Sequence, residues 1–183
     1  MTSVTGQGSA AESYSGFAKL LHWVVAVSVL LIVPIGFIMN IVGGGVLQNV
    51  LYTVHRSLGM LVLALMIVRI VYRLVHGAPA DEPTLEPMQR VASHLVHMAL
   101  YVLVTAQALI GWIATSAYGA AISFFGLFTV PAIVAKDQSL ATPLFTAHEL
   151  LAFGIAGLLF LHIGAALFHY LIRKDGVLQR MLP

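Results

Sequence analysis

Four long apolar segments follow one another along the chain, and shorter stretches rich in glycine, proline and charged residues separate them. Each segment is about as long as an α-helix that crosses the hydrocarbon core of a bilayer. We therefore predict transmembrane helices at residues 17–39, 51–74, 91–116 and 148–172. This pattern indicates an all-α integral membrane protein built as a four-helix bundle.

The three connections between these segments differ in composition. Residues 40–48 form a glycine-rich turn without lysine or arginine, and residues 76–90 form a polar loop in which three prolines oppose regular helix. Residues 117–146 are predicted to be an extended connection. Its apolar part, 120–135, is short and is interrupted by Pro131, so we expect an interfacial or re-entrant segment there.

Local signals predict where the membrane domain and its last helix begin. Residues 1–16 are polar and lack the basic region and short apolar core of a cleaved signal peptide. We expect a disordered tail there, followed by one transmembrane domain at 17–183. Thr146 is predicted to cap the last helix, with Glu149 at the capping-box position, which places His148 in the first turn.

The composition agrees with a membrane protein and narrows its chemistry. The chain has 183 residues, of which 60% are hydrophobic and 9% charged, and such values exclude an ordinary soluble domain. Cysteine is absent, which excludes disulfides, iron–sulfur clusters, thiolate-bound metal and covalently attached haem. The basic residues form no run that would bind nucleic acid. Eight histidines are many for so apolar a chain.

Two of these histidines, His148 and His162, lie on the last apolar segment. An ionisable side chain inside a membrane is costly and usually has a function. The fourteen-residue spacing returns to nearly the same helix face, with an axial separation of about 21 Å. One helix therefore presents an imidazole near each edge of the hydrocarbon core. This placement suits one axial ligand for each of two stacked haems, which would be non-covalent b haems.

The basic residues predict the orientation and the partners of these two histidines. Only Arg56 and Lys136 lie on one side of the four spans, and the positive-inside rule therefore places both termini in the cytoplasm. The other side carries Lys19, Arg69, Arg73, Arg90, Arg173, Lys174 and Arg180. By depth, His22 then pairs with His162 toward the cytoplasm. His55 pairs with His148 on the opposite side, and bis-histidine ligation favours electron transfer over oxygen binding.

Several polar residues near these histidines have more than one interpretation. Arg56 suits a haem propionate, because guanidinium matches carboxylate geometry, and equally a lipid phosphate. Gly59 lies one turn after His55, where a missing side chain lets a flat ring approach the backbone. His94 and His97 could be ligands, propionate partners or hydrogen-bonded packing residues, and we favour the last two. The alternative for His22 is an interfacial histidine, and His76 is expected to be solvated.

The chain resembles the bacterial cytochrome b561 family over nearly its whole length after residue 14. The matching segments are Phe17–Trp23, Val54–Gly59, Ser93–His97, His148–Ala152, Leu161–Asp175 and Leu178–Pro183. The resemblance implies a multi-pass protein of the bacterial inner membrane with two b haems. It also implies electron transfer between a quinone pool and a partner on the outer face. The ligands carried over are His22, His55, His148 and His162.

The family also implies a quinone site near the cytoplasmic haem, and His169 matches a position there. This residue lies seven positions after His162 and about 10 Å further along the helix, where it could relay protons. A polar residue that some members carry two positions before the first-helix histidine is Leu20 here. Some members resemble superoxide oxidases, which pass an electron from superoxide to ubiquinone, and Arg56 with Lys136 could attract such an anion.

Three classes of function are compatible with these features. The first is a quinone-linked oxidoreductase that acts alone, with superoxide or a redox protein as donor or acceptor. The second is a cytochrome b subunit that anchors a dehydrogenase or hydrogenase. The third is a channel or transporter with a histidine proton relay, which does not explain four histidines paired by depth on three helices. The oligomeric state, including a homodimer, stays open.

Overall fold

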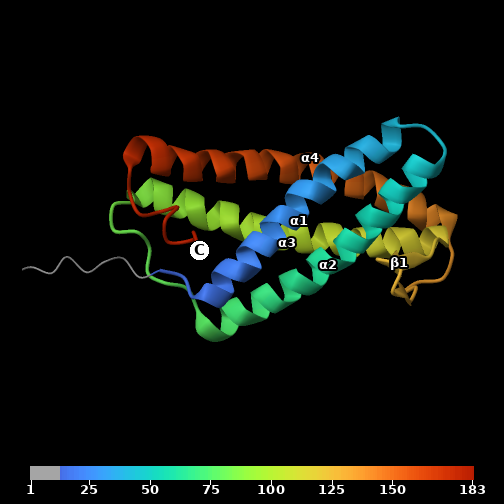
Figure 1. Cartoon of the computed structure of the whole chain (residues 1–183), viewed down its shortest axis with the longest axis horizontal. Coiled ribbons are helices and arrows are strands. Elements are labelled where there is room, and N and C mark those ends of the chain that lie inside the picture. The colour runs from blue at the N-terminus through green and yellow to red at the C-terminus, as the bar shows by residue number, and fades with distance from the viewer. Residues whose placement is uncertain (1–12) are drawn as a thin grey trace, which may run out of the picture.

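The computed structural model describes residues 13–183, and four long helices dominate this part of the chain (Figure 1). They are α1 (Gly16–Ile41), α2 (Val46–His76), α3 (Pro87–Tyr118) and α4 (Gln138–Phe168). A π-helical turn, η1 (His169–Arg173), continues α4, and strands β1 (Ile122–Phe124) and β2 (Phe128–Val130) lie between α3 and α4. Each of the four helices is long and apolar enough to span a membrane, which confirms the predicted fold class.

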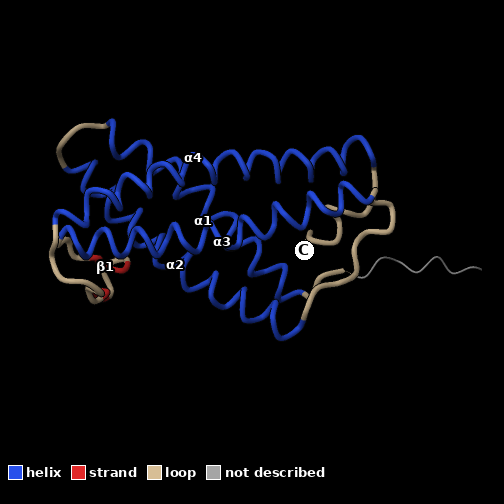
Figure 2. Tube along the Cα trace, turned by 180° about the vertical axis from the view of Figure 1, so that it is seen from behind, coloured by secondary structure: helices blue, strands red, loops and turns tan. Residues whose placement is uncertain are grey.

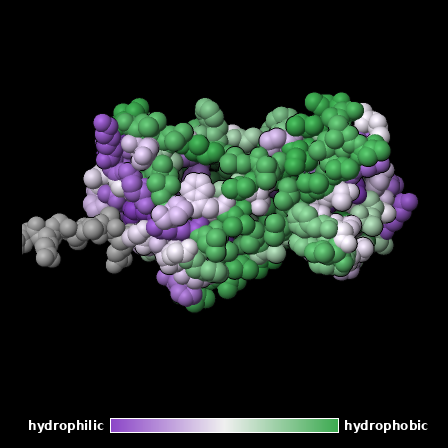
Figure 3. All heavy atoms as spheres, viewed as in Figure 1, coloured by the Kyte–Doolittle hydropathy of each residue, from purple (hydrophilic) through white to green (hydrophobic). Residues whose placement is uncertain are grey.

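The helices pack around a narrow apolar core and expose apolar side chains outward. Helix α3 packs against α4, α1 against α2, and α2 against α3. The core residues are Val25, Val29, Val62, Met66, Val104 and Ile155. Apolar residues also cover much of the outer surface, and polar residues gather toward the two ends of the bundle (Figure 3). A surface of this kind is stable against lipid, so the protein is a multi-pass membrane protein.

Helix α3 begins earlier than the sequence predicted. The loop between α2 and α3 covers residues 77–86 and not 76–90, because Pro87 is the first residue of α3. Proline is favoured at this position, where its missing N–H would have no partner within the helix. Glu86 is the N-cap, and its backbone N–H donates to the side chain of Gln89 in a capping box.

Helix α4 also begins earlier, and the prediction that Thr146 caps it was wrong. Asp137 is the N-cap and accepts hydrogen bonds from the backbone N–H groups of Ser139 and Leu140. The Ser139 hydroxyl contributes most to a lowered pKa of Asp137, so the charged cap persists until the pH falls through that lowered value. Thr146 donates to a backbone carbonyl within the helix, and His148 therefore lies well inside α4.

The connection between α3 and α4 folds into a β-hairpin at one end of the bundle, which we call the hairpin end (Figure 1). Its strands are antiparallel, with Ile122 opposite Val130. Ser57 of α2 is fully buried and fixes the hairpin. Its hydroxyl donates to the Ser123 carbonyl oxygen at 2.8 Å and accepts from the Phe125 N–H at 3.0 Å. The apolar stretch at 120–135 is thus folded onto α2.

Both described chain ends meet at the opposite end of the bundle, which we call the terminal end (Figure 2). Residues 1–12 of the predicted tail lie outside the described residues. The Ser13 hydroxyl and the Tyr14 N–H both donate to the Arg180 carbonyl oxygen. The Trp23 indole N–H donates to the Met181 carbonyl oxygen at 2.8 Å. The C-terminal segment therefore folds back over the first turns of α1.

Replacing Ser57 by alanine should loosen the hairpin. The variant removes the hydroxyl that pairs with the Phe125 N–H and the Ser123 carbonyl, and each of these part-buried hydrogen bonds contributes about 0.5–1.5 kcal/mol. We expect faster proteolytic cleavage between residues 119 and 137, with the helices still folded. Thr53→Ala is the matched control, because the Thr53 hydroxyl donates to the Asn49 carbonyl of its own helix and to no other described residue. Equal cleavage of both variants would contradict the role of Ser57.

Candidate functional site

Two pairs of imidazole rings face each other between the helices. At the terminal end, His22 of α1 and His162 of α4 have ring centroids 6.2 Å apart and an interplanar angle of 69°. Toward the hairpin end, His55 of α2 and His148 of α4 have centroids 6.1 Å apart and an angle of 75°. The structure thus brings together the same two pairs that depth in the sequence suggested.

The separation within each pair suits a metal ion between the rings. If each ligating nitrogen lies about 2 Å from one metal and about 1 Å from its own ring centre, the two centroids lie about 6 Å apart. Both observed separations agree with this value. Imidazole nitrogen is also an established axial donor for haem iron. The residues at both pairs therefore fit a six-coordinate haem, whereas no cysteine is present to fit a covalent one.

The surroundings of His148 hold its ring in a metal-binding form. Its Nδ1 lies 3.1 Å from the Gln107 carbonyl oxygen, and a carbonyl can only accept. The ring proton is therefore on Nδ1, and the lone pair of Nε2 is free for a metal. Gln107 also donates through its side chain to the His148 carbonyl oxygen at 2.8 Å. The ring lies against Gly111, where an added Cβ would be 2.9 Å from Cε1.

His55 lies against a second glycine, on the neighbouring helix. An added Cβ at Gly36 of α1 would be 2.9 Å from the His55 Cε1 atom. The Nδ1 atom of His55 is buried and has no hydrogen-bond partner among the described residues. Gly59, which the sequence suggested for a flat ring, has only Ile32 near its Cβ position, at 3.6 Å. Its role beside a cofactor stays a prediction.

The pair at the terminal end has a different environment. The Arg69 guanidinium donates from Nη2 to the Nδ1 atom of His22 at 2.9 Å. A third imidazole is close, because the ring of His97 lies 5.2 Å from that of His162. This agrees with His97 as a residue beside the site. His94, one turn earlier, instead forms an exposed hydrogen bond from Nε2 to the Asp81 carboxylate at 3.0 Å.

The remaining candidates lie at opposite ends of the bundle. The Arg56 guanidinium stacks over the Tyr52 ring, 5.3 Å from its centroid. At the terminal end His169 begins η1 and is buried, and its Nδ1 lies 2.6 Å from the Asp175 Oδ2 atom. This carboxylate is the polar partner of the buried imidazole. His76 stacks on Tyr72 near the chain ends.

Four residues near the histidine pairs were not singled out from the sequence: Gly36, Gly111, Gln107 and Arg69. The glycines and Gln107 act across helix–helix contacts, and one sequence does not show which turns of two helices meet. Arg69, in contrast, could have been recognised from the sequence. It is a charged residue within an otherwise apolar span, and such a residue is a functional candidate in its own right. It had been used only to predict the orientation.

Comparisons with known proteins agree with a haem-binding membrane bundle. The model of the prokaryotic cytochrome b561 family matches residues 13–183. Cytochrome b561 homolog 2 of Escherichia coli is 36% identical over 128 residues, which cover 70% of this chain and 68% of that protein. Cytochrome b561 homolog 1 of the same organism is 35% identical over 130 residues, covering 70% and 73%. The probable superoxide oxidase CybB of Yersinia pestis is 34% identical over 130 residues, covering 71% and 73%.

The fold and the histidine pairs define a membrane cytochrome, a class of protein that transfers electrons through bound haem. The chain belongs to the prokaryotic cytochrome b561 family. It is therefore a haem b protein that carries electrons in a bacterial membrane, and the lipid bilayer is its immediate surroundings.

Replacing Gly111 by alanine should disturb haem binding through His148. The new methyl group would meet the ring at 2.9 Å, and overpacking of this kind costs about 1–3 kcal/mol. We expect the purified variant to contain less b haem by pyridine haemochrome assay. Gly154→Ala is the control, because among residues 13–183 no atom outside its own stretch of helix lies within 4 Å of its Cβ position. Equal haem contents in the two variants would argue against His148 as a ligand.

Proposed function

We propose that the protein binds two b haems and moves electrons across the membrane between its outer face and the quinone pool. His22 and His162 would hold one haem, and His55 and His148 the other. The observation that carries this proposal is the pair of ring separations, 6.2 and 6.1 Å, at opposite ends of one helix. Each pair would hold its haem through two imidazoles, and this kind of ligation favours electron transfer over oxygen binding.

The chain contributes positions and hydrogen bonds to this function, and haem supplies the one-electron chemistry when bound. Helix α4 provides one histidine to each pair and so fixes the distance between them. The Gln107 carbonyl keeps the proton of His148 on Nδ1, so the lone pair of Nε2 is free to bind iron. The apolar core residues offer no polar group that would hold water between the helices. By the positive-inside rule the terminal end faces the cytoplasm, as expected for the bacterial inner membrane.

His169 supports a quinone site at the terminal end. Quinone reduction takes two electrons and two protons, so it needs a proton donor near the ring. The Asp175 carboxylate accepts a hydrogen bond from the Nδ1–H of His169 at 2.6 Å and orients the imidazole, which leaves Nε2 for the substrate. A π-helical turn begins at this residue, and such turns are frequent at functional sites. The proposed acceptor is ubiquinone or another quinone.

The proposed donor at the outer face is superoxide. One relative at 34% identity is named a probable superoxide oxidase. Arg56 and Lys136 place two positive side chains at the hairpin end, where the Asp137 carboxylate also lies, and these cations would attract a small anion. A membrane anchor for a dehydrogenase or hydrogenase is the second candidate, and it would require a peripheral subunit that copurifies with the chain. Superoxide-driven quinone reduction by the isolated protein would favour an oxidoreductase that acts alone over such an anchor.

Alanine variants of the four histidines should remove the haems in pairs. His22→Ala and His162→Ala should lose one haem, and His55→Ala and His148→Ala the other, because each variant removes an axial ligand. Acid–acetone extraction and pyridine haemochrome quantitation measure the content, with two extractable haems expected in the wild type. His94→Ala is the control. One haem in the wild type, or loss of haem in the control but not in His22→Ala, would overturn the assignment.

Replacing His169 by alanine should slow quinone reduction and leave the haem spectrum unchanged. We expect a loss of at least about tenfold, or about 1.4 kcal/mol of barrier, if the imidazole binds the quinone or relays protons to it. Turnover with a water-soluble quinone in reconstituted vesicles is the measurement. Asp175→Asn should produce part of this loss, because it removes the carboxylate that orients the ring. Unchanged turnover at all quinone concentrations would leave His169 with a structural role only.

A further inference from the structure

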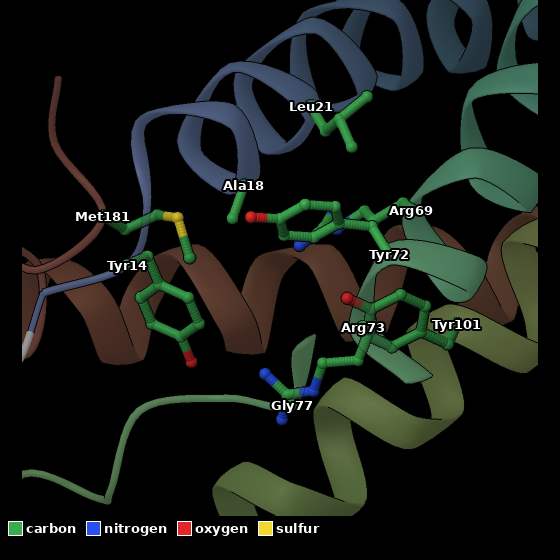
Figure 4. A pocket seen from close by; sticks show the side chains of 9 residues that line it. All are labelled: Tyr14, Ala18, Leu21, Arg69, Tyr72, Arg73, Gly77, Tyr101 and Met181. Carbon is green, nitrogen blue, oxygen red and sulfur yellow. The ribbon is translucent and has the colours of Figure 1, made fainter. Parts of the chain in front are cut away.

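Arg69 and Arg73 lie one turn apart on α2 and line a small cavity at the terminal end (Figure 4). Tyr14, Tyr72 and Tyr101 line the same cavity, and the Arg69 guanidinium lies 5.1 Å from the centroid of the Tyr101 ring. The cavity has a volume of about 30 Å³. This leaves room for the end of a polar group, whereas sites for a whole cofactor are roughly ten times larger or more.

The two guanidinium groups in this cavity have no counter-charge in the described part of the chain. No aspartate or glutamate among residues 13–183 forms an ion pair with either of them. Arg90 and Arg173, at the same end, pair with Asp81, Glu86 and Asp175. Arg69 is half-buried between helices, and a charge withdrawn from water without a counter-charge is costly. The cavity is therefore suited to an anion.

The hydrogen bond from Arg69 to His22 indicates the identity of this anion. Arginine can only donate, so the Nδ1 atom of His22 accepts and the ring proton is on Nε2. In that tautomer Nε2 has no lone pair for a metal. If Nε2 of His22 binds iron, the proton moves to Nδ1 and the bond from Arg69 is lost. The guanidinium then needs another acceptor, and the cavity that it lines is adjacent.

We propose that Arg69 and Arg73 form a carboxylate site for the propionates of the haem bound by His22 and His162. This inference rests on the ligand assignment proposed above. Haem b carries two propionates, and guanidinium groups bind carboxylates through paired, charge-assisted hydrogen bonds. Binding of the haem thus exchanges the partners of Arg69, from an imidazole nitrogen to a carboxylate. The two positive charges also favour the reduced haem, so they raise the midpoint potential of this haem relative to a neutral site.

The test is a redox titration of the purified, haem-loaded protein with visible detection. Wild type should show two waves, and the wave that disappears in His22→Ala identifies the haem at the terminal end. Arg69→Gln and Arg73→Gln should each lower the potential of that wave and leave the other unchanged. Arg69→Lys should restore part of the shift, because it keeps the charge but not the paired geometry. Arg90→Gln is the matched control, since it removes a positive charge at the same end that is already paired.

Infrared redox difference spectra identify the bound group directly. Protein loaded with haem labelled by ¹³C at the propionate carboxyls should show labelled carboxylate bands that shift in Arg69→Gln and not in Arg90→Gln. A lipid phosphate in the cavity is the competing source of an anion. In that case native mass spectrometry would show a retained phospholipid that Arg69→Gln releases, with unchanged potentials and carboxylate bands, and our proposal would be wrong.

The redox titration also separates this inference from the ligand assignment. Two haem waves that do not respond to Arg69→Gln or Arg73→Gln would overturn the carboxylate site and leave the histidine pairs intact. A single wave in wild type, or retention of both waves in His22→Ala, would instead overturn the ligand assignment on which the inference rests. If Arg69→Gln does not accumulate, Arg69→Lys still decides, because an unchanged potential together with unchanged carboxylate bands would contradict a paired contact with the propionates.

Discussion

The structure depends on the cost of placing polar side chains in an apolar bundle that has no water to bond them. Three such side chains have a partner on another helix or on a loop. Ser57 bonds the hairpin, His148 bonds the Gln107 carbonyl, and His22 accepts from Arg69. Because these partners lie on neighbouring elements, the polar contacts also fix how the helices pair and at what depth.

The four spans could be predicted because the length and apolarity of a segment decide whether it crosses a membrane. The helix ends could not be predicted from the same signal. Asp137 and Thr146 can both cap a helix, and tertiary structure selects the earlier one. Pro87 was interpreted as a helix breaker, although at the first position of a helix its missing N–H costs nothing. The apolar stretch at 120–135 was too short for a span, and its sequence did not indicate that it forms a β-hairpin.

The depth of the histidines could also be predicted, since an apolar helix converts sequence position into distance along the membrane normal. The contacts that hold the rings could not. Gly36 and Gly111 lie on helices other than those of the histidines they accommodate, so no spacing within one segment indicates them. The partner exchange that we propose for Arg69 follows from its hydrogen bond to His22 on another helix, and only the folded structure shows this contact.

Helix α4 carries one histidine of each pair, and this limits how the chain can change length in evolution. A single residue inserted between His148 and His162 would rotate one ring by about 100° relative to the other. After such an insertion one of the two histidines would no longer face its partner on α1 or α2, unless those helices also changed. Lengthening the connection between α3 and α4 has no such effect, because it leaves both rings in place. Related chains should therefore vary in length at the hairpin and keep a constant interval within α4.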